Sequence, residues 1–272
     1  MRWINRRPRR PAAIILALVP FVIVIGAYVI ASDIRLAENP SDRLTPAPSQ
    51  IIDTFVTLAT EPDRRTGRIP LWSDTWASLQ RLLAGVAIAA GIGLIFGLLI
   101  GLLPFARAGL APFAAAISLV PPLALLPILF IVFGLGETAK IVLIVVGIGP
   151  FLIRDLSQRV LEIPSELLVK AQTLGAFTWQ IALRVALPQV LPRLVQAVRL
   201  SLGPAWLFLI AAEAIAAEGG LGYRIFLVRR YLAMDIILSY VVWITFLAFL
   251  LDYALKSLSR AAFAWFHGGE DL

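Results

Sequence analysis

Long apolar runs without a charged residue alternate with short charged segments along the chain. A helix needs roughly 20 mainly apolar residues to cross a bilayer, and three runs reach that length. Three shorter runs reach it only if a flanking charge extends to the membrane surface or lies in a protein-lined interior. The long runs are 11–32, 82–106 and 108–136, and the shorter ones are 141–153, 200–212 and 236–251. The pattern predicts an all-α membrane protein with six transmembrane helices.

Composition supports the same class. The chain is 60% hydrophobic and 15% charged, with a mean hydropathy of +0.87, which is more apolar surface than one soluble globule can bury. The net charge is +7, and the basic residues cluster beside the apolar runs. This placement indicates membrane topology and no nucleic-acid partner. The absence of cysteine, with a single His267, excludes disulfides and predicts no metal site.

Basic residues predict the orientation, because positive loops stay on the cytoplasmic side. They gather in 1–10, in 154–199 and at Lys256 and Arg260, so both termini are expected in the cytoplasm of a bacterium, with the spans in its inner membrane. The predicted parts are a basic N-terminus (1–10), a first transmembrane helix (11–32), a periplasmic segment (33–77), a five-helix core (78–260) and a cytoplasmic tail (261–272). Apolar spacing after Pro48 predicts a short amphipathic helix along the outer membrane surface.

The first apolar run has two interpretations. A basic start, an apolar stretch and Val29-Ile30-Ala31 resemble a cleavable secretory signal. The run is about twice the usual 7–15 residues of such a signal, which favours a retained anchor.

The charged segment 160–190 predicts two short helices joined by a tight turn. Pro164 and Ser165 suit a helix start, and Glu166 suits the positive end of the helix dipole. An apolar stripe follows, and Gly175 can adopt the left-handed conformation that ends a helix. The stripe consists of Leu167, Leu168, Ala171 and Leu174. We expect Thr178 to cap the second helix and Pro188 to end it.

The same segment resembles the signature of the inner-membrane permease subunits of binding-protein-dependent ABC importers. It reads Lys170-Ala171-Gln172-Thr173-Leu174-Gly175, then nine residues, then Val185-Ala186-Leu187-Pro188. The resemblance implies a cytoplasmic coupling-helix pair, within 164–188, that sits in a groove of a separate ATPase. The implied coupling residues are Glu166, Lys170, Ala171, Leu174, Gly175, Ala176, Leu187 and Pro188. Val169 and Lys170 stand where the family has Glu and Ala. The substitution removes the carboxylate that could make an ionic contact there, and it does not change the turn on Gly175.

The resemblance covers about 78–266, and within it the chain is similar to the nitrate, sulfonate and taurine branch of these importers. It includes Val120-Pro121-Pro122, Gly203-Pro204-Ala205-Trp206 and Gly220-Leu221-Gly222-Tyr223, and the segment 226–231 resembles relatives associated with urea or guanidine breakdown. It implies a type I importer core paired with a second copy, two cytoplasmic ATPases and an outer substrate-binding protein, in membrane lipid. No Walker phosphate loop occurs in the chain, so we expect no enzyme activity and no bound cofactor, with ATP and Mg on the partner ATPase.

Several residues are candidates for the translocation path. Three prolines within seven residues, at 121, 122 and 127, free backbone carbonyls, which membranes tolerate only in protein or beside water. The alternative is a kinked packing helix. Glu213 either lines the path or gate, with Trp206 on a nearby turn, or pairs with Arg199 of the partner subunit or with Arg224. The path candidates are Pro121, Pro122, Pro127, Trp206 and Glu213.

Gly93, Gly97 and Gly101 recur every four residues, which predicts close helix packing. An ion-coupled secondary transporter or a channel is the alternative function. Secondary transporters usually have internal repeats and paired intramembrane charges, and neither is evident in the sequence.

Overall fold

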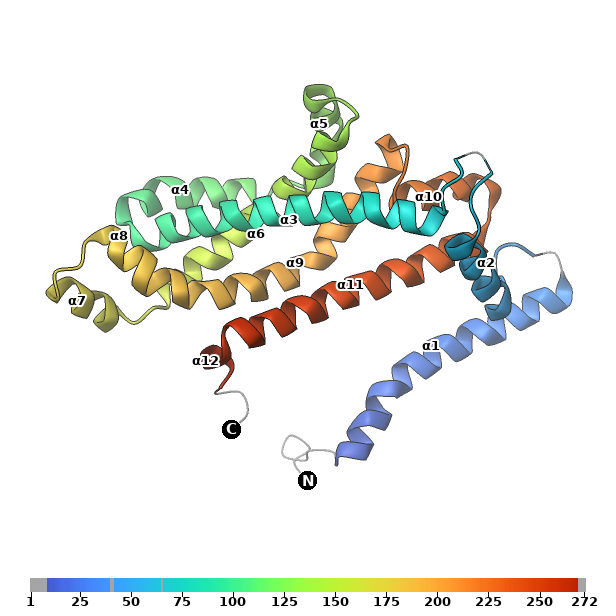
Figure 1. Cartoon of the computed structure of the whole chain (residues 1–272), viewed down its shortest axis with the longest axis horizontal. Coiled ribbons are helices and arrows are strands. Elements are labelled where there is room, and N and C mark those ends of the chain that lie inside the picture. The colour runs from blue at the N-terminus through green and yellow to red at the C-terminus, as the bar shows by residue number, and fades with distance from the viewer. Residues whose placement is uncertain (1–8, 40–41, 65, 269–272) are drawn as a thin grey trace.

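The computed structural model describes residues 9–39, 42–64 and 66–268, and all regular structure within them is helical (Figure 1). The N-terminal helices are α1 (Arg10–Glu38), α2 (Pro48–Thr60), α3 (Pro70–Leu102) and α4 (Pro104–Ile117). The short helix η2 (Pro122–Leu125), α5 (Leu126–Phe133), α6 (Glu137–Leu161), α7 (Ser165–Thr173) and α8 (Thr178–Ile181) follow. The chain continues through η3 (Ala182–Ala186), α9 (Leu187–Ala216), α10 (Leu221–Val228), η4 (Arg229–Tyr231), α11 (Met234–Ala262) and α12 (Ala264–His267).

Four helices in the described part of the chain are long and apolar enough to cross a membrane. They are α1, α3, the continuous helix 178–216 and α11, and α4 with the segment 122–133 makes a fifth if that bent pair is one span. The sixth predicted run, 141–153, lies within α6. The all-helical fold is confirmed, and the number of six spans stays a prediction.

The run 108–136 does not form one straight span, which corrects the sequence prediction. α4 ends at Ile117, and the helical segment that starts at Pro122 is bent by 82° from it. Pro122 and Pro127 lie in the first turns of η2 and α5, where a missing N–H removes no helical hydrogen bond. The prolines therefore start new helices after a break.

The centre of the fold is a parallel pair of long helices, α3 and α6. A Cβ atom built on Gly85, Gly93 or Gly97 would lie 2.7–2.9 Å from the side chain 59 positions later, and Gly101 meets Val160 in the same way. The side chains met are those of Ile144, Leu152, Leu156 and Val160. This constant offset means that the two helices run in the same direction and touch along one face. The predicted packing role of Gly93, Gly97 and Gly101 is confirmed.

The helix α1 hardly contacts the rest of the chain. Its most apolar window has no buried residue, and side chains such as Phe21 and Val24 are exposed. It is tied to the following loop near its end, where Tyr28 Oη donates to Pro46 O (2.7 Å) and Ser32 Oγ donates to Thr45 O (3.0 Å). The predicted first helix therefore forms, with its apolar surface turned away from the other helices.

The predicted amphipathic helix after Pro48 also forms, as α2. It packs on the beginning of α11, where Thr54 Oγ1 donates to Asp235 Oδ2 (2.9 Å) and the Phe55 ring lies 5.7 Å from that of Trp243. Figure 1 shows α2 and α10 at one end of the long axis and α7 and α8 at the other. The end of α11 points toward the α7 end.

Candidate functional site

Two short helices meet at a sharp turn on Gly175. α7 ends at Thr173, and Gly175 follows in the left-handed conformation with a φ of 81°. Its N–H donates to the carbonyl of Gln172 (2.9 Å), and the Ala176 N–H donates to that of Ala171 (3.1 Å). This pair of bonds is the Schellman arrangement, in which glycine is favoured because an L side chain is strained at positive φ. The turn that the sequence predicts is present, and its role in coupling stays a prediction.

The turn and its two helices, the elbow (164–188), expose apolar side chains at the end of the molecule. Leu174 is 80% exposed and Phe177 68%. Leu168 is half-buried and packs on a small cluster that holds the elbow to the body. That cluster consists of Leu156, Val160, Ile163, Ala186 and Val190. The predicted apolar stripe thus divides into a half-buried part at Leu168 and an exposed part at Leu174.

The other predicted coupling residues lie along the same elbow. Glu166 is in the first turn of α7, and Lys170 is near its end, both with exposed side chains. Leu187 is half-buried and Pro188 is exposed at the start of α9.

Two details of the second short helix differ from the prediction. Thr178 does not cap it, because the cap residue is Phe177, whose N–H donates to Gln180 Oε1 (2.8 Å). Pro188 does not end it, since residues 178–216 are one continuous helix. A π turn at Ala182–Ala186, in which the Leu187 N–H bonds to the carbonyl of Ala182, precedes the proline. The wider turn shifts the bonding pattern just before Pro188 and so accommodates its ring.

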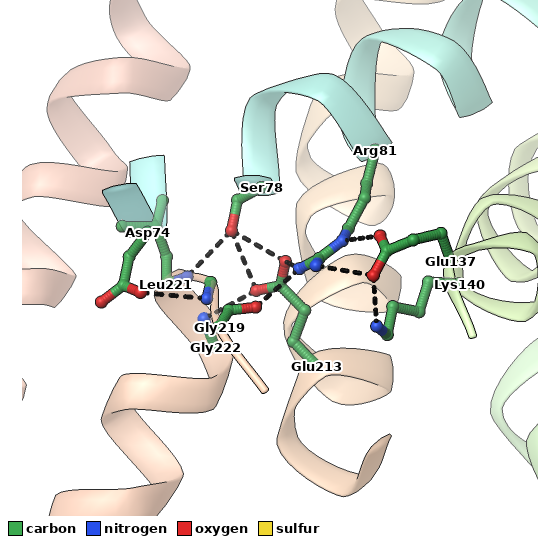
Figure 2. A network of polar contacts seen from close by, with 10 residues as sticks. Asp74, Ser78, Arg81, Glu137, Lys140, Glu213, Gly219, Leu221 and Gly222 are labelled. Carbon is green, nitrogen blue, oxygen red and sulfur yellow. Dashed lines mark hydrogen bonds and ion pairs between the residues drawn. The ribbon is translucent and has the colours of Figure 1, made fainter. Parts of the chain in front are cut away.

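At the opposite end, Glu213 is fully buried in a network of polar contacts (Figure 2). Its carboxylate accepts from Arg81 Nη1 (2.6 Å) and from the N–H of Gly222 (2.8 Å). Ser78 Oγ lies 2.8 and 3.0 Å from its two oxygens. Arg81 continues to Glu137, which also accepts from Lys140 Nζ (2.9 Å).

A second carboxylate, Asp74, extends the same network. It accepts from Arg224 Nε (2.9 Å), from Tyr240 Oη (2.9 Å) and from the Gly220 N–H (3.1 Å). The three acids and three bases of the network balance in charge. A cluster that neutralises itself in this way fixes helix ends from α3, α6 and α9 to the turn before α10.

The glycines of that turn are required by their surroundings. Gly220 has a φ of 130°, and a Cβ there would lie 2.5 Å from Glu213 Oε1 and 2.8 Å from Arg81 Nη1. A Cβ on Gly222 would lie 2.7 Å from the carbonyl oxygen of Ile210. The backbone therefore approaches the carboxylate closely only because these residues lack side chains.

The partners predicted for Glu213 were wrong. Arg199 pairs with Asp252 of the same chain (2.8 Å), and Arg224 pairs with Asp74. Sequence reasoning missed Arg81 as the partner. The available signal was the position of Arg81, directly before the apolar run 82–106, since charged residues in membrane helices usually pair with one another.

The path candidates do not gather in one place. Pro121 and Pro127 are exposed at the break between α4 and α5, and Pro122 is half-buried there. Trp206 is 4% exposed within the core, and its Nε1 has no hydrogen-bond partner among the described residues. The broken segment reaches that core through Leu126. Whether these residues line a path stays a prediction.

The two ends of this helical bundle, with an exposed elbow at one and a buried charge network at the other, suit a membrane transport subunit, and comparison with known proteins gives the class. Residues 89–263 match the family of binding-protein-dependent transport system inner membrane components, and the chain belongs to that family. The chain is therefore an integral-membrane permease subunit of an ABC importer.

Particular relatives agree with that class. The taurine transport system permease protein TauC of Escherichia coli is 35% identical over 82% of this chain and 80% of its own. The nitrate import permease protein NrtB of Synechococcus elongatus is 29% identical over 82% of this chain and 78% of its own. A chain of the inward-facing MetNI methionine ABC transporter superposes with a TM-score of 0.61 and 25% identity, covering 70% of this chain and 96% of that one. The resemblance to the taurine, nitrate and sulfonate branch is confirmed.

Proposed function

We propose that this permease subunit couples to a separate cytoplasmic ATPase through the elbow (164–188). The observation that carries the proposal is the exposed Leu174 beside a rigid Schellman turn on Gly175. Small apolar knobs on rigid supports fit grooves of partner proteins. The turn transmits displacement because α8 continues without interruption into the long helix that ends near Glu213.

The importer operates as two permease subunits, two ATPases and an outer substrate-binding protein. The exposed apolar surface of α1 and of the α4–α5 segment supports contact with a second copy and with lipid. Both termini lie on the cytoplasmic side with the elbow, which the basic residues favour. The binding protein docks at the other end, over the loops near Glu137 and 218–235, and delivers a small polar solute.

ATP and Mg act on the partner ATPase in this scheme, and closure of the ATPases moves the elbows. The path then opens outward, takes the solute and resets after hydrolysis. The buried network around Glu213 holds the outer ends of α3, α6 and α9 as one unit during that motion.

The test uses the complete importer in proteoliposomes. Leu174→Glu places a charge on a side chain that is 80% exposed, so folding is expected to be unchanged while ATP-driven uptake and copurification of the ATPase are lost. The matched control is Gln172→Glu, which adds the same charge two residues earlier, at an exposed polar position in the last turn of α7. Normal uptake and ATPase recovery with Leu174→Glu would show that the elbow is not the contact. Uptake that persists without ATP would instead favour an ion-coupled transporter.

A further inference from the structure

Beside the break in the α4–α5 segment lies a cavity of about 570 Å³ that the charge network and the elbow do not use. α4, α3 and α6 line it, and Figure 1 shows α4 beside α3 in the half of the molecule that carries α7 and α8. Its polar lining is Ser118, Arg154, Asp155, Ser157 and Gln158. The volume is in the range of small-ligand sites.

Arg154 differs from the charged residues around it. Its Nη1 donates to Ser118 Oγ (2.7 Å), and within the described ranges it has no carboxylate partner. Asp155, which also lines the cavity, pairs with Arg159 (3.5 Å). Arg159 also pairs with Glu162 (3.1 Å), so these two acids and two bases balance in charge, and Arg154 is the member without an ion pair of its own among the described residues.

The position of Arg154 strengthens the case for a ligand. It lies seven residues before the end of α6 at Leu161, about 10 Å along the helix at 1.5 Å per residue. Ser118, its partner, is the first residue after α4 and lies at the break. Arg154 is exposed and belongs to the basic segment expected on the cytoplasmic side, next to the break, and broken helices in transporters mark where solute is held.

We propose that Arg154, with Ser118, forms a transit site for the anionic group of the transported solute. A planar guanidinium suits a carboxylate, nitrate or sulfonate group, because it offers a fork of N–H donors to two oxygens. Ser157 Oγ donates to the carbonyl of Arg154 (2.8 Å), and Gln158 adds a neutral donor at the rim. This inference deepens the proposed import function and rests on it.

The chain has no cysteine, so a single introduced thiol reports on the cavity. Ala115→Cys places it on the lining, and the complete importer is labelled in phosphatidylcholine vesicles with an anionic (sulfonatoethyl) or a cationic (trimethylammonioethyl) methanethiosulfonate. One charge about 4 Å away changes the local concentration of each reagent roughly fivefold, in opposite directions. Arg154→Gln should therefore lower the anionic-to-cationic rate ratio at least about tenfold. Arg154→Lys should keep most of it.

Two controls separate this effect from general changes. Arg260→Gln removes one exposed positive charge in the last turn of α11 and should leave the ratio unchanged. A thiol at Ala182, in a different cavity, should not respond to Arg154→Gln. Millimolar methanesulfonate should slow labelling of Ala115→Cys, while urea should not.

An unchanged ratio in Arg154→Gln overturns the proposal, as does equal protection by urea. Protection by phosphatidylglycerol in the vesicles, without any by methanesulfonate, would assign the site to a lipid headgroup and also overturn it. If Arg154→Gln does not assemble, methanesulfonate protection with Arg154 intact still decides. Failure of the import function would appear separately, as absence of ATP-driven uptake in the unaltered importer.

Discussion

The buried carboxylate of Glu213 allows the sharpest prediction about stability. In Glu213→Gln the side chain keeps its shape but has one oxygen in place of two. Arg81 Nη1 donates to one carboxylate oxygen and the Gly222 N–H donates to the other. The amide NH₂ must therefore face one of these donors, which loses its acceptor in a fully buried site.

The magnitude follows from these contacts. A buried donor without an acceptor costs about 1–3 kcal/mol, and the charge assistance to Arg81 is lost as well. We expect a loss of about 3 kcal/mol, which corresponds to a fall in Tm of roughly 6–12 °C at 2–4 °C per kcal/mol for a chain of this size.

The assay is thermal unfolding of the purified importer in detergent, followed by loss of the monodisperse complex. Asp252→Asn is the control, because its pair with Arg199 is partly exposed, with side chains 41% and 26% accessible, and such pairs contribute about 0–1 kcal/mol. Equal Tm values for Glu213→Gln and the unaltered chain would refute the assignment of Glu213 as a buried structural centre.

Three further predictions concern other parts of the fold. Gly97→Val should destabilise the α3–α6 pair, since even a Cβ atom at that position would lie 2.7 Å from Leu156 Cβ. Gly91→Val, which points into open space, should not, and thermal unfolding compares the two variants. Gly175→Ala should slow ATP-driven uptake because its φ of 81° strains an alanine by roughly 1–2 kcal/mol, and the uptake rate measures this. The hydrogen bond from the Leu44 N–H, helped by Thr45 and Arg35, lowers the pKa of Asp42 below its usual range, so the loop contact persists until the pH falls through that lowered pKa; amide exchange at Leu44, which Asp42→Asn should speed at neutral pH, is the measurement.

Features that depend on neighbours along the chain were predictable from the sequence. The turn on Gly175 needs only a helix that ends before a residue without a side chain. The close packing of the glycine face of α3 could be predicted from the four-residue spacing, because any neighbouring helix can approach such a face closely. Apolar runs located α1, α3 and α11 because length and hydropathy define a spanning helix.

Features that depend on distant residues were not predictable in this way. Arg81 and Glu213 are 132 positions apart, and no local pattern pairs them. The break after Ile117 was missed because hydropathy records how apolar a run is and not its direction. Proline position was the signal, since Pro121 and Pro122 are typical of a helix start as well as of a kink.

The coupling claim is tested most directly by crosslinking from the elbow. A single cysteine at Leu174, in a chain that has none of its own, is carried into inside-out membrane vesicles with the complete importer and treated with a short thiol-to-amine crosslinker. A cysteine at Leu44, exposed near the opposite end, is the matched position. A covalent product between this subunit and the ATPase from Leu174, and none from Leu44, is the expected result. Crosslinking to the ATPase from Leu44 and none from Leu174 would contradict both the contact and the orientation.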